Sequence, residues 1–137
     1  MSTSEFVGLE VGRSVRLTQT LTDQREGDFL RASGDRNPLH LDSAFAREHG
    51  YGDRLAHGLL VAGVVLPALG QLFPSRGFVC LSQTIKYRAP VLVGDTVDVE
   101  ATITHLTPSL GVVVVRTTVS IEDRPVLTGE IQAKLLA

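Results

Sequence analysis

The stretch from residue 55 to residue 75 contains no Lys, Arg, Asp or Glu, and its middle, residues 59–69, is apolar on every side. A helix that is apolar all round belongs in the core of a folded protein or in a membrane. A membrane span is disfavoured because Pro67, Pro74 and Gln71 interrupt the stretch, which falls short of the roughly 20 continuous apolar residues that a span needs. We therefore expect a buried helix over residues 59–69, kinked or ended at Pro67.

The second half of the chain has the composition of a sheet. Short connections join four long runs rich in Val, Ile and Thr, which are residues 78–87, 96–105, 111–121 and 126–136. Connections this short imply that consecutive runs are antiparallel neighbours. Residues 14–21 alternate apolar and polar side chains and predict a further half-buried strand. The order of elements predicts an α+β fold, in which a curved antiparallel sheet wraps around the buried central helix.

Two more helices are predicted between the first strand and the buried helix. Thr22 is a suitable N-cap for the first, which should stop near Gly34, a residue that tolerates the left-handed conformation. Asp42 can cap a second helix over residues 43–49, closed by Gly50.

At 137 residues the chain predicts a single domain, residues 1–137, large enough to bury a core without disulfides or metals. The net charge is −2 with both signs interspersed, so nothing indicates a nucleic-acid or membrane partner. Cys80 is the only cysteine; it excludes an internal disulfide, fits a reducing cytosol, and lies in an apolar run where we expect a small core residue. The N-terminus lacks a basic start followed by an apolar run, so we expect no secretory signal and a cytoplasmic protein.

The only compact acid–base pair lies in the segment SGDRNPLH, residues 33–40. Asp35 and His40 are five residues apart, and Pro38 makes a helix here unfavourable, so we expect the two to meet on a loop. The carboxylate could then hold the imidazole in one tautomer or share one water with it, and either arrangement transfers protons near neutral pH. The alternative is that Asp35 is an ordinary turn residue and His40 a surface histidine.

Two later segments extend this pattern. With AHGLL at residues 56–60 and PVLVGDT at residues 90–96, the segment SGDRNPLHLD at residues 33–42 resembles the MaoC-like dehydratase family of the hot-dog fold, which includes the (R)-specific enoyl-CoA hydratases. The resemblance covers nearly the whole chain, residues 7–136. Its first motif is specific, whereas the last is shared more widely among hot-dog proteins and indicates mainly the fold.

The resemblance implies roles for three residues. Asp35 and His40 are the implied catalytic pair, and the backbone N–H of Gly58 is the implied donor to the thioester carbonyl. Adding water to a 2-enoyl thioester needs an activated water at Cβ, a proton at Cα and stabilisation of the enolate-like oxygen. Gly58 would stand at the start of the buried helix, where free N–H groups favour developing negative charge. No metal or redox cofactor is needed.

Asn37 and His57 complete the candidate site, and we assign them with Gly58 to substrate binding. Asn37 would orient the pair or hold the turn, and His57 would cap or pack against the active-site loop rather than transfer protons. The four histidines lack a matching ligand set, so we expect no metal site. Some hydratases of the family carry Ser eight residues after the glycine; Leu66 stands there in this chain, which leaves the acyl chain-length preference open.

The leading hypothesis is a lyase that hydrates trans-2-enoyl-CoA to (R)-3-hydroxyacyl-CoA or catalyses the reverse dehydration. The alternatives are a hot-dog acyl-CoA thioesterase and a non-catalytic acyl-thioester binding subunit. The spacing Asp-x-Asn-Pro-x-His favours the lyase, and a mere binder would need neither Asp35 nor His40. We expect an acyl-CoA or acyl-carrier-protein thioester as substrate. We also expect a homodimer, because a small sheet around one helix leaves long edges uncovered.

Overall fold

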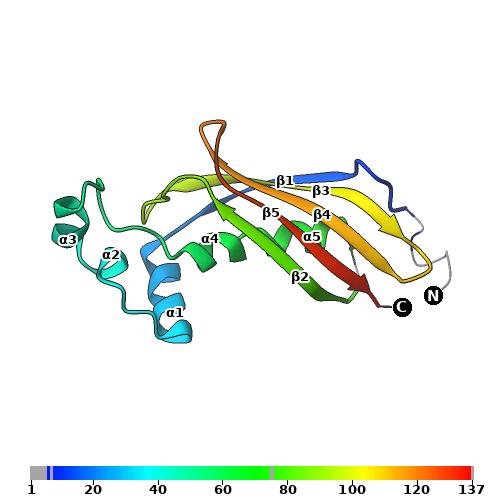
Figure 1. Cartoon of the computed structure of the whole chain (residues 1–137), viewed down its shortest axis with the longest axis horizontal. Coiled ribbons are helices and arrows are strands. Elements are labelled where there is room, and N and C mark those ends of the chain that lie inside the picture. Colours follow the sequence, from blue (N-terminus) through cyan, green and yellow to red (C-terminus); the bar gives the residue numbers. More distant parts are fainter. Residues whose placement is uncertain (1–5, 7, 75, 137) are drawn as a thin grey trace.

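The computed structural model describes residues 6, 8–74 and 76–136. Within them, five antiparallel strands form one sheet in the order β1-β3-β4-β5-β2 (Figure 1). The strands are β1 (Ser14–Thr20), β2 (Phe78–Tyr87), β3 (Thr96–Thr107), β4 (Val112–Ile121) and β5 (Arg124–Leu135). All five predicted strands are confirmed, β2 with its predicted bounds.

One predicted strand pairing is wrong. β2 does not lie beside β3, because it pairs with β5 at the far edge of the sheet. The connection over residues 88–95 forms no hairpin, since its backbone bonds instead to the segment that leads into the central helices. Ala56 N–H donates to the Val91 carbonyl at 2.7 Å, and Val93 N–H donates to the Arg54 carbonyl at 3.0 Å. The pairings of β3 with β4 and of β4 with β5 are confirmed.

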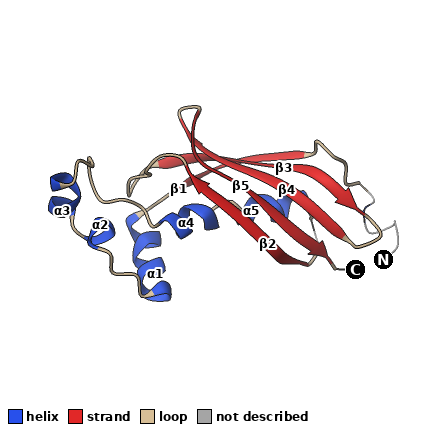
Figure 2. Cartoon of the chain, viewed as in Figure 1, coloured by secondary structure: helices blue, strands red, loops and turns tan. Residues whose placement is uncertain are grey.

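Two short helices, α4 (Gly58–Gly63) and α5 (Leu66–Leu72), lie against one face of the sheet, where the sequence predicts one longer helix (Figure 2). Pro67 lies in the first turn of α5, where its missing N–H removes no helical hydrogen bond, so the break falls before the proline. Residues of both helices join strand residues in one core cluster. Leu59 and Leu66 are nevertheless 63% and 45% exposed, because the sheet covers only one side of the helices.

Helices α1 (Asp23–Ser33) and α3 (Ser43–Glu48) lie beyond one end of the sheet (Figure 1). The hydroxyl of Thr22 accepts a hydrogen bond from the N–H of Arg25, and Gly34 ends α1 with a φ of 72°. Asp42 caps α3 by accepting from the N–H of Phe45. The predicted caps of both helices are confirmed.

The sequence predicts a loop between α1 and α3, but part of this segment is helical. Residues Pro38–Leu41 form a single helical turn, α2, which carries His40. Asn37 is the N-cap of this turn, and Pro38 occupies its first position, where the fixed φ of proline suits a helix start. Proline therefore begins a helix here instead of preventing one.

Strand β2 is an edge strand with mostly exposed side chains. Cys80 is exposed, so the expectation of a core cysteine is wrong. Val79 and Leu81 are 47% and 52% exposed, which leaves an apolar surface along this edge. On its paired side, β2 runs so close to β5 that a Cβ at Gly129 would collide with the carbonyl oxygen of Thr84.

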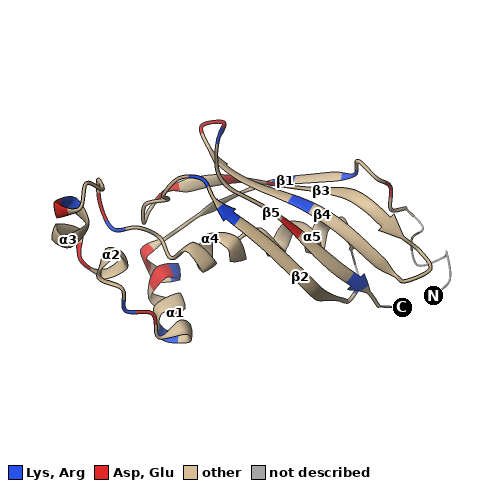
Figure 3. Cartoon of the chain, viewed as in Figure 1, with Lys and Arg blue, Asp and Glu red and all other residues tan. Residues whose placement is uncertain are grey.

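Acidic and basic residues are spread over helices, strands and turns, and Figure 3 shows no gathering of either sign. This distribution accompanies the small net charge of −2. Within the described ranges, the helices are too short or too polar for any of them to cross a membrane.

Candidate active site

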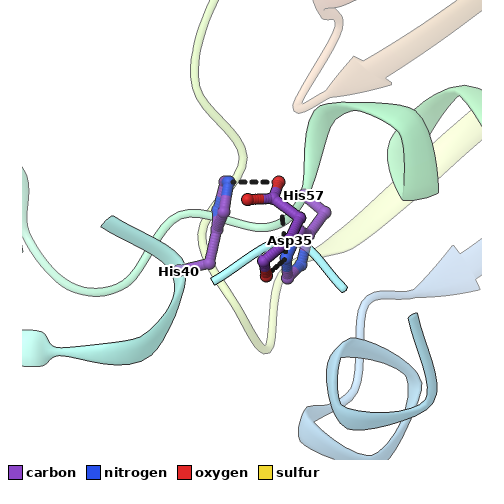
Figure 4. Close-up of side chains that lie close together, drawn as sticks. All are labelled: Asp35, His40 and His57. Carbon is purple, nitrogen blue, oxygen red and sulfur yellow. Dashed lines mark hydrogen bonds and ion pairs between the residues drawn. The ribbon is translucent and has the colours of Figure 1, made fainter. Parts of the chain in front are cut away.

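The predicted catalytic pair comes together: Asp35 follows α1, and His40, on α2, faces it (Figure 4). A carbonyl oxygen can only accept, so His40 donates its Nδ1–H to the carbonyl of Leu55, 2.8 Å away. Its Nε2 then faces Asp35 Oδ2 at 3.7 Å, which suits an ion pair or a bridging water but is too long for a direct hydrogen bond. The side chain of His40 is 11% exposed and that of Asp35 is 45% exposed, so the pair lies at the boundary with solvent.

Asp35 is also a turn residue, so a structural role in the turn and a role in proton transfer are compatible for this side chain. Its Oδ1 accepts from the N–H of Asn37 at 3.1 Å, which leaves Oδ2 to face His40. Asn37 in turn accepts from the N–H of Leu39 at 3.1 Å. The turn thus fixes the carboxylate with one oxygen while the other points toward the imidazole. The side chain of Asn37 acts on the backbone of α2, and the structure gives it no direct contact with either member of the pair among the described residues.

His57 belongs to the same cluster. Its ring stacks on that of His40, with centroids 3.9 Å apart and planes inclined by 27°. Its Nε2 lies 3.3 Å from the backbone oxygen of Asp35 and 3.8 Å from Oδ2 of the same residue. The side chain of His57 is 1% exposed and lies behind Asp35, on the buried side of the site (Figure 4).

Asp35, His40 and His57 each place one potential metal ligand within 4.8 Å of the other two. An imidazole binds a metal along the plane of its ring at about 2 Å. Two ring planes that stack at 3.9 Å with an inclination of only 27° do not meet at that distance from both nitrogens. The arrangement therefore favours proton transfer over a shared metal ion.

Gly58 is the first residue of α4, directly after His57. Among the described residues, no group accepts a hydrogen bond from its N–H. Gly58 and His40 line one pocket of about 400 Å³, together with Tyr51, Tyr87 and residues of the 88–91 connection. The ring of Tyr87 packs on Gly58 so tightly that a Cβ there would lie 2.9 Å from its Cζ. Burial raises the pKa of the Tyr87 phenol, which therefore stays protonated beside Gly58.

Glu26 is a further residue of the site and was not among those predicted from the sequence. It lies on α1, is 4% exposed, and contacts both the backbone and the ring of His57. A signal exists in the sequence, because Glu26 precedes Phe29 and Leu30 by three and four positions and so shares their face of the helix. A carboxylate on the core-facing side of a helix requires a buried partner.

The fold, the motif and the site geometry agree with one family. Residues 7–124 match the family described as MaoC like domain, and the chain belongs to that family. The predicted family resemblance and hot-dog fold are confirmed.

Two curated relatives are similar over most of their length. The chain is 38% identical over 130 residues to a 3-hydroxybutyryl-CoA dehydratase of Methylorubrum extorquens, covering 95% of this chain and 83% of the relative. It is 34% identical over 128 residues to an (R)-specific enoyl-CoA hydratase of Aeromonas caviae, covering 93% and 96%.

Solved structures give the same result. The (R)-hydratase from Aeromonas caviae involved in PHA biosynthesis superposes with a TM-score of 0.87 at 34% identity, covering 94% of this chain and 98% of that one. The R-hydratase PhaJ1 from Pseudomonas aeruginosa superposes with a TM-score of 0.84 at 31% identity, covering 96% and 87%.

Proposed function

We propose that this protein is a hydro-lyase that adds water to trans-2-enoyl-CoA to give (R)-3-hydroxyacyl-CoA, or catalyses the reverse dehydration. The observation that carries the proposal is the arrangement of Asp35 and His40 beside the N–H of Gly58, which has no acceptor in the described part of the chain. The relatives of the chain are named as hydratases and dehydratases of acyl thioesters.

Asp35 and His40 act on one water in this proposal. The Asp35 carboxylate accepts a proton from the water while His40, held by the Leu55 carbonyl, positions it. The oxygen of the water bonds to Cβ, and the pair returns a proton to Cα, so the elements of water are added in full. The N–H of Gly58 stabilises the enolate-like thioester oxygen between the two steps. Asn37 holds the turn that aims the carboxylate, and His57 supports it from below.

The substrate class is an acyl-CoA or an acyl-carrier-protein thioester. Incubating the purified protein with trans-2-enoyl-CoA esters of graded chain length tests the proposal. We expect loss of the conjugated double bond and appearance of 3-hydroxyacyl-CoA without release of free thiol. Release of free CoA without hydration would assign a thioesterase, and no turnover by the protein alone would favour a binding subunit.

A homodimer is the second part of the proposal. The outer edge of β2 has no partner strand among the described residues, and Val79 and Leu81 on it are exposed. Leu59 and Leu66 expose further apolar surface on the central helices. A second copy would cover such surfaces. Sedimentation should give a dimer that Leu81→Arg converts to monomer, and a monomer at all working concentrations would contradict the proposal.

A single MaoC-like domain over residues 1–137 and a cytoplasmic location complete the proposal. The family match over residues 7–124 and the free thiol of Cys80 support them. One cooperative unfolding transition, and recovery of the protein in the cytoplasmic fraction of cells, are the expected results.

A further inference from the structure

Glu26 and His57 form a buried pair that joins two distant parts of the chain. Oε2 of Glu26 lies 2.5 Å from Nδ1 of His57. The backbone N–H of His57 also donates to the carboxylate, with distances of 3.1 Å to Oε1 and 3.2 Å to Oε2. The two side chains are 4% and 1% exposed, so water does not compete for these bonds. The carboxylate of α1 therefore fixes both the position and the orientation of the ring before α4.

One proton of His57 can be placed from its neighbours. Nε2 faces the carbonyl oxygen of Asp35 at 3.3 Å and its Oδ2 at 3.8 Å, and because a carbonyl oxygen only accepts, Nε2 carries a proton. A second proton lies in the 2.5 Å contact between Nδ1 and Oε2 of Glu26. Both ring nitrogens and both carboxylate oxygens of this buried pair are therefore hydrogen-bonded, as burial of such groups requires.

The Nε2–H of His57 is thus directed at Asp35, the residue that removes a proton from water in the proposed reaction. Its bond to the Asp35 carbonyl fixes the backbone of that residue, whose Oδ2 lies 3.8 Å from the same nitrogen. The other titratable groups around His57, within the described part of the chain, are His40 stacked on its ring and Tyr87 beside Gly58. Phe29 packs on a third side with ring centroids 5.0 Å apart and brings no charge.

We propose that Glu26 is a positioning residue for the hydration reaction, which holds the ring of His57 with its Nε2–H directed at Asp35 and so fixes Asp35 in the place where it faces the reacting water. The inference rests on the proposed hydratase function. It gives His57 a role in holding the reacting residue, beyond the packing role expected from its sequence position.

Glu26→Gln is the test variant, because it keeps the shape of the side chain and removes its charge. We expect kcat to fall by roughly 10- to 100-fold while KM stays within about threefold, since the change acts on proton transfer and not on thioester binding. Glu48→Gln, which removes an exposed charge at the end of α3, is the matched control and should leave both quantities unchanged.

A second measurement needs no activity. The imidazole 15N shifts of His57, assigned with His57→Gln, should show a proton fixed on Nε2 in the parent and exchange of the ring proton between the two nitrogens in Glu26→Gln. A parent in which Nε2 of His57 carries no proton overturns the inference, even if Glu26→Gln fails to fold. An active parent whose kcat survives Glu26→Gln also overturns it and leaves the hydratase function intact. An inactive parent in which Glu26 fixes the Nε2 proton rejects the function and retains the positioning relation.

Discussion

The imidazole rings of His40 and His57 stack with their centroids 3.9 Å apart, although one belongs to α2 and the other precedes α4. Both Nε2 atoms approach the same oxygen of Asp35, at 3.7 Å and 3.8 Å. The outer ring, His40, lines the pocket, whereas the inner ring, His57, is buried. The carboxylate thus has one imidazole that can reach substrate and one that cannot.

If Asp35 and His40 act as one unit on one water, their substitutions should not be additive. We expect Asp35→Ala and His40→Ala each to lower kcat by about 10² to 10⁴, the range for a positioned proton-transfer group. The double variant should be little worse than the worse single variant. Steady-state kinetics of the four proteins measures this.

Asp35→Asn separates the catalytic role from the turn role, because an amide oxygen can still accept from the N–H of Asn37. This variant should unfold at the temperature of the parent and lose activity like Asp35→Ala.

A double variant of Asp35→Ala and His40→Ala whose loss in kcat is the product of two large single losses contradicts the shared water. If neither single variant loses even tenfold in kcat, Asp35 and His40 are turn residues and not catalytic residues.

The stereochemistry of the product is a separate test. One pair that holds both the attacking water and the proton for Cα works from one face of the double bond, and the family resemblance implies the R product. Hydration coupled to an S-specific 3-hydroxyacyl-CoA dehydrogenase should therefore reduce no nicotinamide cofactor, whereas an R-specific one should reduce it. Strong signal from the S-specific enzyme would reject the assignment.

A side chain at position 58 should disturb the site through Tyr87. In Gly58→Ala the new Cβ would lie 2.9 Å from Cζ of Tyr87, so the ring or the start of α4 must move. A shift of about 1 Å at a reacting group can cost about 10² in rate, and we expect a loss of kcat/KM of that order. Gly70→Ala on α5 is the control, since a Cβ there meets no atom of the described residues within 4 Å, and it should keep full activity.

Adding Tyr87→Ala to Gly58→Ala relieves the contact. The double variant should recover part of the unfolding temperature lost in Gly58→Ala. If Gly58→Ala and Gly70→Ala have the same kcat/KM, the close approach of Tyr87 to Gly58 does not affect catalysis.

Asp53 allows a test of the loop that follows α3. A hydrogen bond from the hydroxyl of Ser43, 2.7 Å away, is the main cause that lowers the pKa of Asp53, and the N–H of Arg54 adds to it. A carboxylate with a lowered pKa stabilises the fold at pH above its unfolded value, and this contribution is lost as pH falls through the folded value. Ser43→Ala should raise the pKa of Asp53 toward that of an ordinary aspartate, as followed by NMR titration. Ser109→Ala, in the exposed turn before β4, should not, and an unmoved Asp53 in Ser43→Ala would contradict the assignment.

Local signals predicted most of the elements. The caps at Thr22, Gly34 and Asp42 were readable because each depends on residues within a few positions. Two errors arose where a local rule has two outcomes. Proline both ends helices and begins them, so the turn at Pro38 and the division before Pro67 were not predicted.

Tertiary contacts account for what the sequence could not show. The motif brought Asp35, His40 and Gly58 into one prediction, but the pairing of Glu26 with His57 joins residues 31 positions apart and depends on how α1 packs beside α4. The position of β2 at the edge likewise depends on the path of residues 88–95 across the segment before α4, which no periodicity encodes. Cys80 lies on β2, so the edge position of this strand also explains why the expectation of a core cysteine is wrong.

Gly129 lies on β5, outside the site, but its lack of a side chain affects how β2 approaches the site. Any side chain there would push against the carbonyl of Thr84 and displace β2, whose last residue, Tyr87, packs on Gly58. A substitution at this position would therefore lower activity through Tyr87 and Gly58, although Gly129 itself belongs to neither the pocket nor the catalytic pair. When the effects of substitutions are compared, Gly129 should be grouped with the residues of the site and not with those of an ordinary strand.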